Sequence, residues 1–324
     1  MIELLDIKVD VVFKDFFGDR SNKEILESFI NAILALEGDD QIEVEEFLDP
    51  RKMRVDIGRP STFVDLSVKT RGGERYIIEM QTYNHEGFDK RLLYYLGKDY
   101  TEQIDYHREG AERMSKKLIN YHDLPKVHII AVIDFHRSSQ EKNGILNGQK
   151  VVETYRFKPE FSETNKHLFD QWRATIVDLK KFSNKPLSQL KTDKEKWFYL
   201  LKNASSIKEK EADRLKKEPV FQRALERLER LSSDPVKRKA YEASINEHRD
   251  HLAVLSSERK EGLKEGLKEG LREGRQEEKF AIAKKMLKRN RPIEEVAEDT
   301  GLSTEDIWAL DRELKQEISS SKPS

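Results

Sequence analysis

The sequence predicts an α/β protein: a mixed central sheet flanked by helices, followed by an α-helical C-terminal extension. Up to about residue 185, short apolar runs alternate with helical patterns, and residues 127–133 are the clearest such run. Because this run is short, apolar and rich in β-branched residues, it is typical of a buried strand. After about Pro186 the chain becomes polar and its patterns become helical. This change in composition separates a globular domain from an extension.

An amphipathic helix is predicted near the start of the chain. Residues 21–24 read Ser-Asn-Lys-Glu, which fits a capping box, and the apolar residues from Ile25 to Leu34 recur at helical spacing. A second helix is predicted from about Gly87 to His107. The predicted strands are a short one with Ile42, Val44 and Phe47, two with Asp65 and Glu79, and three at residues 127–133, 151–157 and 174–179.

The C-terminal part is expected to consist of helices around an internal repeat. Proline near the start of each of two helical patterns, at Pro219 and Pro235, favours helix N-termini there. From Glu261 a four-residue motif, Glu-Gly-Leu followed by Lys or Arg, occurs three times, and a degenerate fourth copy follows. We predict five segments: a globular domain at 1–185, a helical extension at 186–260, a repeat helix or linker at 261–278, a helical segment resembling a helix-turn-helix at 279–318 and a disordered tail at 319–324.

The composition limits the class of protein. Charged residues make up 37% of the 324, but the formal net charge is only -1, so DNA binding would need a local basic patch. There is no cysteine, which excludes disulfides and thiolate metal sites. The first residues are acidic where a signal peptide is basic, and no apolar run reaches the length of a membrane span. We therefore expect a soluble protein of a reducing compartment, the cytoplasm.

Two acids on neighbouring strands form the most informative pattern. Asp65 and Glu79 lie fourteen residues apart on extended segments joined by Gly72-Gly73. A carboxylate on each arm of a hairpin suits Mg²⁺, which takes oxygen ligands and keeps several waters. Spacing alone also fits a simpler interpretation, in which both acids lie on the solvated face of an antiparallel pair.

The length of the hairpin loop decides whether these acids can meet. A two-residue loop would put Asp65 and Glu79 on opposite faces, because side chains alternate along a strand. A three-residue loop or a β-bulge would put them on one face, with Asp65 opposite Gln81 and Glu79 opposite Ser67. We predict the three-residue loop or bulge, since Gly72-Gly73 tolerates it.

Several segments together resemble a known family. They are Asp10-Val-Val-Phe-Lys14, Phe17-Gly18, Asp65, Ile78-Glu-Met-Gln81 and Lys90-Arg-Leu-Leu-Tyr-Tyr95. In this order they are similar to the PD-(D/E)XK nuclease-type transposases, also called the Rpn family of recombination-promoting nucleases. The Glu-Gly-Leu-Lys repeats and residues 234–255 are similar to that family's C-terminal half, so the resemblance spans most of the chain.

The resemblance implies a restriction-endonuclease-like core, of PD-(D/E)XK type, that uses Mg²⁺ or Mn²⁺. Asp65 and Glu79 match the metal-binding acids. Gln81 stands where the wider superfamily has lysine, and an amide orients water by hydrogen bonds without supplying charge. Three lysines are open as the source of that charge: Lys14, Lys69 and Lys90. Asp10 lies one helical turn before Lys14, and the resemblance adds both residues to the candidate catalytic set.

Candidate DNA contacts lie in two places. Arg91, Tyr95 and Lys98 share one face of the second predicted helix, where Arg and Lys would bind phosphate and Tyr would donate a hydrogen bond. A solvated face with aromatic packing fits them equally well. In the C-terminal segment the last predicted helix is acid-rich, so we place any DNA contact on the basic residues before it, represented by Lys284 and Lys288.

The repeat places glycines at 262, 266 and 270 on a slowly drifting stripe. Each glycine costs an isolated helix roughly 1 kcal/mol relative to alanine. The repeat is therefore either a helix stabilised by a partner, such as a second copy of the chain in a homo-oligomer, or a flexible charged linker.

These patterns support two hypotheses of different class. The first is a metal-dependent DNA endonuclease associated with mobile elements or recombination. The second is a non-catalytic DNA-binding or assembly protein whose nuclease core has decayed, and Gln81 is the residue that favours it.

Overall fold

The structure is a computed structural model. It describes residues 3–49, 64–84, 87–111, 124–137, 150–157 and 170–320. The chain forms two compact units, Met1–Asn246 and Glu247–Ser324. Within the described residues, no helix is long and apolar enough to cross a lipid bilayer.

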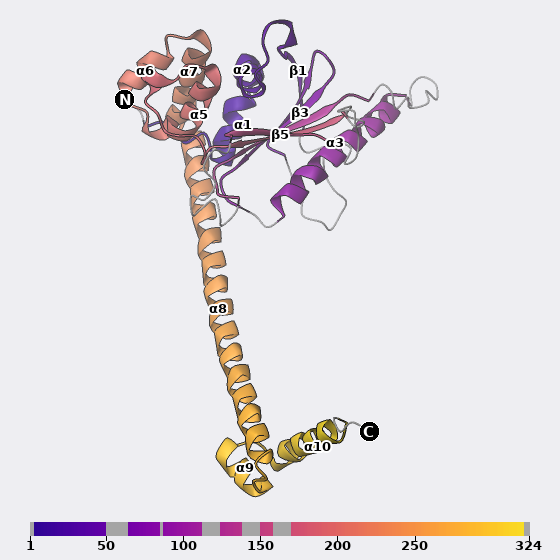
Figure 1. Ribbon diagram of the computed structural model, residues 1–324. Helices are drawn as coiled ribbons and strands as arrows, with labels where there is room; N and C mark the ends of the chain where they lie inside the picture. The colour runs from indigo at the N-terminus through magenta and orange to yellow at the C-terminus, as the bar shows by residue number, and fades with distance from the viewer. Residues whose placement is uncertain are drawn as a thin grey trace. The chain divides into compact units, whose positions relative to one another are not determined.

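The first unit contains a six-stranded mixed sheet, in the order β1-β2-β3-β4-β6-β5 (Figure 1). β2 is antiparallel to both β1 and β3. β3, β4 and β6 run parallel to one another, and β5 is antiparallel to β6. The predicted α/β class is confirmed. The strands are β1 (Val44–Leu48), β2 (Leu66–Thr70), β3 (Arg75–Gln81), β4 (Val127–Ile133), β5 (Val152–Tyr155) and β6 (Trp172–Asp178).

Helices cover both faces of the sheet, because each face carries an apolar stripe that must be buried. The larger core cluster packs one face against α1 (Asp10–Phe17), α2 (Lys23–Leu34), α5 (Asp193–Asn203), α6 (Glu209–Leu215) and α7 (Pro219–Ser233). The smaller cluster packs the other face against α3 (Phe88–Ala111). Short 3₁₀ helices are η1 (Arg20–Asn22), η2 (Gly38–Asp40), η5 (Leu187–Gln189) and η6 (Ala204–Ser206).

The capping box predicted at the start of α2 is wrong, although the helix and its buried apolar face are confirmed. Ser21 lies in η1, where its backbone N–H and its hydroxyl both donate to the Asp19 carboxylate. The residue before α2 is Asn22, whose side chain makes no capping hydrogen bond. The Ser21 side chain is therefore hydrogen-bonded to Asp19 and does not cap α2.

The hairpin between β2 and β3 has the predicted three-residue loop. Thr70 pairs with Glu74 across residues 71–73, and Gly73 has a φ of 85°, which favours glycine. The predicted partners are wrong by two residues: Leu66 pairs with Ile78, so Asp65 extends the ladder opposite Glu79 instead of Gln81. The backbone N–H of Arg71 donates to the carbonyl of Glu43, so Arg71 leaves the ladder early. The number of loop residues is still odd, and the acids share a face.

The second unit has its own small core. It contains most of α8 (Pro235–Leu287), together with α9 (Ile293–Thr300) and α10 (Thr304–Ser320). The end of α8 packs against α9 and α10 through Ala283, Val296 and Ile307, and Gly301 turns the chain between the last two helices. The repeat lies inside α8 and is helical. Of the predicted tail, residues 319 and 320 belong to α10, and residues 321–324 lie outside the described residues.

His128 on β4 is a buried histidine whose titration should affect stability. Its Nε2 lies 2.8 Å from Oγ1 of Thr175, its ring stacks on Tyr76, and burial lowers its pKa to about 3. Below about pH 6.5 the His128 side chain is protonated in the unfolded chain but stays neutral in the folded protein. Stability is therefore lost as pH falls from 6.5 towards 3. We expect a loss of about 1.4 kcal/mol per pH unit from this group.

Urea unfolding of the wild type and of His128→Gln between pH 7.5 and 5 checks this expectation. Glutamine cannot titrate, so the free energy of unfolding should fall less steeply with pH in the variant. Parallel pH dependences would contradict it.

Candidate active site

Asp65 and Glu79 face each other at the place where β2 begins and β3 nears its end. Each is only 7% exposed. The backbone N–H of Met80 donates to Oδ2 of Asp65 at 2.7 Å, which fixes the direction of that carboxyl group. The side chains of Asp65 and Glu79 are hydrogen-bonded to each other. Two carboxyl groups thus meet in a buried position, whereas the simpler interpretation required a solvated face.

Helix α1 adds a third acid and a lysine to this pair. Its apolar face, with Phe13, Phe16 and Phe17, is buried in the larger core, which leaves the face of Asp10 and Lys14 at the sheet edge. Lys14 Nζ lies 2.7 Å from Oδ1 of Asp10 and 3.2 Å from Oδ1 of Asp65. Asp10 is also hydrogen-bonded to Asp65. The Asp10–Lys14 pair is therefore part of the acid cluster.

The charges of the cluster are unevenly distributed. Burial raises the pKa of Asp65 to about 7, and burial together with the charge of Asp65 raises the pKa of Glu79 well above its ordinary value. Asp10 has a lowered pKa: burial opposes ionisation, but the hydrogen bonds from Asp65 and Lys14 outweigh it. The pKa of Lys14 is raised, since the attraction of Asp65 and Asp10 outweighs burial. The cluster thus contains more carboxylate than its surroundings can keep ionised.

Gln81 and helix α3 close the other side. Oε1 of Gln81 accepts from Nη2 of Arg91 at 2.6 Å, and Nε2 of Gln81 donates to the carbonyl of Tyr83. The charge of Arg91 acts on Glu79. Tyr95 is 4% exposed, and burial, followed by the charge of Glu79, raises its pKa to about 12. The amide of Gln81 therefore holds an arginine beside the acids.

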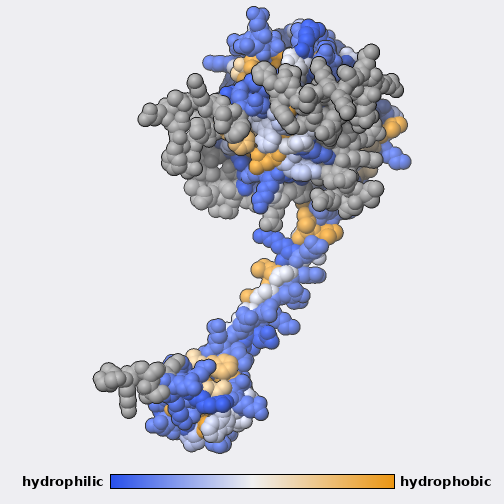
Figure 2. All heavy atoms as spheres, turned by 90° about the vertical axis from the view of Figure 1, so that its right-hand side faces the viewer, coloured by the Kyte–Doolittle hydropathy of each residue, from blue (hydrophilic) through white to orange (hydrophobic). Residues whose placement is uncertain are grey.

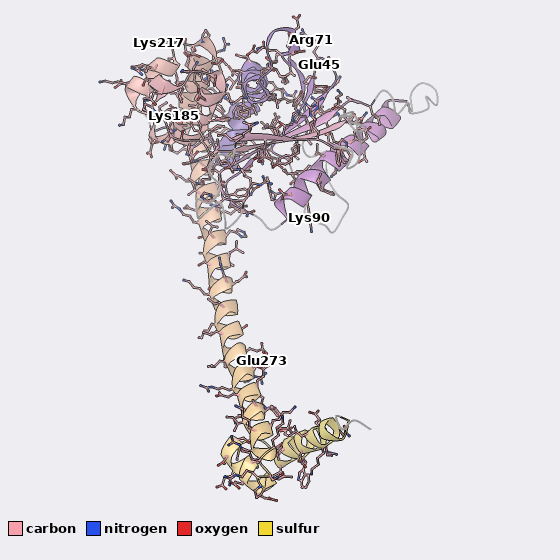
Figure 3. The ribbon with its side chains drawn as sticks, viewed as in Figure 1. Glu45, Arg71, Lys90, Lys185, Lys217 and Glu273 are labelled. Atoms are coloured by element: carbon pink, nitrogen blue, oxygen red, sulfur yellow. The ribbon has the colours of Figure 1, made fainter. Side chains whose placement is uncertain are left out.

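The other predicted residues are spread more widely. Lys98 lies half-buried on α3. Lys69 pairs with Glu45 of β1 at 2.9 Å, and Lys90 is exposed near the start of α3 (Figure 3). Of the three lysines that the sequence left open, Lys14 is the one in contact with Asp65. The structure assigns the half-buried Lys284 and the exposed Lys288 to the second compact unit.

Comparison with known proteins agrees with this arrangement. The profile of the family described as PD-(D/E)XK nuclease family transposase matches residues 7–258, more than half of the chain. The chain belongs to this family. Comparison with curated proteins and with solved structures found no match. The mixed sheet with flanking helices is consistent with the PD-(D/E)XK fold, and membership implies a nuclease-related function with DNA as substrate.

PD-(D/E)XK nucleases typically use divalent metals, and the donor set fits a hard cation. In the described parts of the chain, no group of three or more His, Asp and Glu side chains is arranged to enclose a metal ion. Mg²⁺ does not need such an enclosure, since it is usually bound by one or two carboxylates, several waters and substrate phosphates. Asp65 and Glu79 supply two carboxyl groups whose pKa values are raised by burial and by the neighbouring acids. These two residues would hold the ion.

The sequence-based predictions missed a second polar group beside Gln81, which is formed by Asp134 with Lys8 and Lys180. The backbone N–H of Asp134 donates to the carbonyl of Gln81 at 2.9 Å, and Lys8 and Lys180 contact the carboxylate of Asp134. The signal that could have found it is position: Asp134 follows a predicted buried strand, and ligands of α/β sheets lie at the carboxyl ends of parallel strands.

Proposed function

We propose that this protein is a Mg²⁺-dependent or Mn²⁺-dependent DNA endonuclease, acting in recombination or on mobile elements. One observation carries the proposal: Asp65 and Glu79 are opposed and buried, with Lys14 in contact with Asp65. Purely structural acids are normally solvated or fully neutralised, whereas strongly perturbed carboxyl groups beside a lysine are typical of active sites.

Each residue has a distinct role in the proposal. Asp65 and Glu79 hold the metal, which when bound polarises the phosphodiester and lowers the pKa of a bound water. Lys14 supplies the positive charge that lysine provides elsewhere in the superfamily. Gln81 orients the attacking water or the substrate, and Asp10 keeps Lys14 in place through their 2.7 Å ion pair.

Binding of the DNA backbone is assigned to α3 in this proposal. Arg91 is held by Gln81 beside the acids, and in the proposal its remaining N–H groups contact the scissile phosphate. Tyr95, one turn further on, is proposed as a hydrogen-bond donor to the same group. Lys98 is the candidate for the neighbouring phosphate, and its Nζ, which is buried without DNA, would have to turn outward to reach it. Lys284 and Lys288 supply non-specific phosphate contacts from the second unit.

A second candidate is a non-catalytic DNA-binding or assembly protein. The observation that favours it is the hydrogen bond from Arg91 to Gln81. Gln81 stands where the superfamily has lysine, and this bond occupies its side-chain oxygen. The two candidates differ in whether the protein cleaves DNA with added metal.

A plasmid assay separates them. Purified protein should nick supercoiled plasmid with Mg²⁺ and should stop nicking when EDTA is added. The control is Asp65→Ala purified in the same way. Equal nicking by this variant would assign the cleavage to a contaminant. Plasmid that stays intact with the wild-type protein and Mg²⁺ would favour the second candidate.

We also propose that the protein assembles as a homo-oligomer through α8. The repeat leucines Leu263, Leu267 and Leu271 are 74%, 73% and 57% exposed. Along α8, hydrophobic patches interrupt a mostly hydrophilic surface (Figure 2). Among the described residues, no atom would lie within 4 Å of a Cβ added at Gly262, Gly266 or Gly270. A second copy of α8 would cover the leucines, and the glycines would let the two helices approach closely.

Substitutions in the repeat test this assembly by light scattering after gel filtration. Replacing the three leucines with lysine should convert the oligomer to monomer. Replacing Gly262, Gly266 and Gly270 with alanine discriminates further: alanine stabilises an isolated helix by roughly 1 kcal/mol per residue, but it clashes in a close helix pair. We expect the alanine variant to assemble less well. A monomeric wild type, or an alanine variant that only melts at higher temperature, would contradict the proposal.

A further inference from the structure

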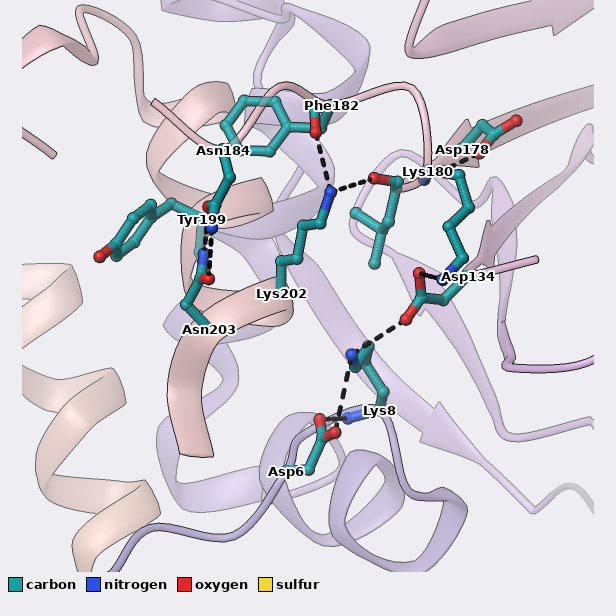
Figure 4. A network of polar contacts seen from close by, with 11 residues as sticks. Asp6, Lys8, Asp134, Asp178, Lys180, Phe182, Asn184, Tyr199, Lys202 and Asn203 are labelled. Carbon is teal, nitrogen blue, oxygen red and sulfur yellow. Dashed lines mark hydrogen bonds and ion pairs between the residues drawn. The ribbon is translucent and has the colours of Figure 1, made fainter. Parts of the chain in front are cut away.

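A second charged cluster lies at the carboxyl ends of β4 and β6 (Figure 4). Its centre is the carboxylate of Asp134, which is shared by two lysines from different parts of the chain. Lys8 Nζ lies 2.9 Å from Oδ2, and Lys180 Nζ lies 3.2 Å from Oδ1. Lys8 comes from the segment before α1, and Lys180 from the turn after β6.

Two more lysines stand around this pair. Lys202 on α5 donates to the carbonyls of Leu179 and Phe182, and its charge interacts with those of Lys8 and Lys180. Lys181 lies 3.5 Å from Asp178 at the end of β6. The cluster thus brings four lysines together with the aspartates Asp6, Asp134 and Asp178, so positive charge is in excess.

The cluster adjoins the candidate active site. Parallel strands β3, β4 and β6 are neighbours, and Asp134 is hydrogen-bonded to the backbone of Gln81. Strand spacing is about 4.8 Å, so the carboxyl ends of β4 and β6 lie about 5 and 10 Å from that of β3. Lys8 also precedes Asp10 of the acid cluster by two residues.

We propose that Lys8 and Lys180, supported by Lys202, bind backbone phosphates of the DNA next to the scissile one. The inference rests on the proposed nuclease function and extends its substrate path from the acids along the carboxyl edge of the sheet. In the absence of DNA, Asp134 is the counter-ion that holds both ammonium groups in position. A phosphate takes over that role when DNA binds, because its anionic oxygens accept hydrogen bonds from lysine ammonium groups as the carboxylate does.

Equilibrium binding of a fluorescent 20-base-pair duplex in EDTA, measured by anisotropy at several salt concentrations, tests the inference. Lys8→Gln with Lys180→Gln should lower affinity about tenfold and reduce the slope of log K against log salt by about 0.9 for each phosphate that is no longer neutralised. The matched control is Lys126→Gln. Lys126 pairs with Asp170 at 2.8 Å beside the opposite end of β4, and its loss should leave the slope unchanged.

Asp134→Asn provides a variant with the opposite expected sign. It removes the counter-ion and leaves the lysines, so DNA affinity and the salt slope should both rise if the lysines bind phosphate. A purely structural cluster would give unchanged or weaker binding with an unchanged slope. Thermal melts confirm that each variant is folded, which removes unfolding as a cause of lost affinity.

The outcomes separate this inference from the proposed function. A wild type that cleaves DNA, with double-lysine and Asp134→Asn variants that bind like Lys126→Gln, overturns the inference alone. A wild type that neither binds nor cleaves duplex DNA overturns both. Inorganic phosphate, matched with chloride in ionic strength, should displace the duplex no better than chloride, and stronger displacement would assign the cluster to free phosphate.

Discussion

Asp65→Asn should abolish DNA cleavage, and the same substitution should stabilise the metal-free protein against unfolding. Loss of a metal ligand removes several kcal/mol of transition-state stabilisation, so nicking should fall roughly a thousandfold or more. Asp65 is buried and hydrogen-bonded to two other acids. At pH 8 the buried Asp65 carboxylate is repelled by the charges of Asp10 and Glu79. A neutral amide of the same shape removes this repulsion, and we expect the free energy of unfolding in EDTA at pH 8 to rise by about 1–2 kcal/mol.

Added Mg²⁺ gives the corresponding control. Ligand binding stabilises only the folded state that binds it, so Mg²⁺ should raise the melting temperature of the wild type and leave Asp65→Asn unchanged. Glu79→Gln should behave in the same way. Asp170→Asn is the matched control for loss of a paired aspartate, because Asp170 lies by the opposite end of the sheet beside Lys126. An active Asp65→Asn, or one with an unaltered Mg²⁺ response, would exclude Asp65 as a ligand.

Lys14→Met should have the second largest effect, a loss of about a hundredfold in the cleavage rate at saturating Mg²⁺. Lys14 is the lysine in contact with Asp65, and Gln81 cannot supply charge. Single-turnover cleavage of a labelled duplex over a range of Mg²⁺ concentrations measures the rate and the metal affinity separately.

The sequence itself supplies the control variants, Lys69→Met and Lys90→Met. Lys69 pairs with Glu45, and Lys90 is exposed on α3, so both should cleave at the wild-type rate. If Lys14 were only a counter-ion that metal displaces, Lys14→Met would bind Mg²⁺ more tightly and cleave normally. That result would contradict its catalytic role.

Periodicity predicted the fold well where one residue type dominated a segment. The strand at 127–133 is buried on both faces and has no alternation to misread, so its bounds match β4. Short-range polar signals were less reliable: Ser21 fits a capping box, but Asp19, two residues earlier, competes for its N–H. The order of the strands in the sheet is a long-range property, which local patterns do not contain.

For the site, side-chain alternation along the strands, combined with the predicted three-residue loop or bulge, predicted that Asp65 and Glu79 share a face. It did not predict which residues pair, because the departure of Arg71 from the ladder depends on Glu43, 28 positions earlier. Tyr95 shows another limit. Helical spacing placed it with Arg91, but burial beside Glu79 follows from how α3 packs on β3. Lys8 and Lys180 meet Asp134 only through the tertiary fold.

The three-residue loop at 71–73 has a consequence for how this protein can vary over evolution. Surface loops usually tolerate gains and losses of single residues. Here a single-residue insertion or deletion inside β2 or β3, between either acid and the loop, would turn Glu79 to the opposite face from Asp65, although no acid had been changed. Viable length variants of this hairpin should therefore gain or lose residues between Thr70 and Glu74, where the strand pairing can be kept, and not within the strands.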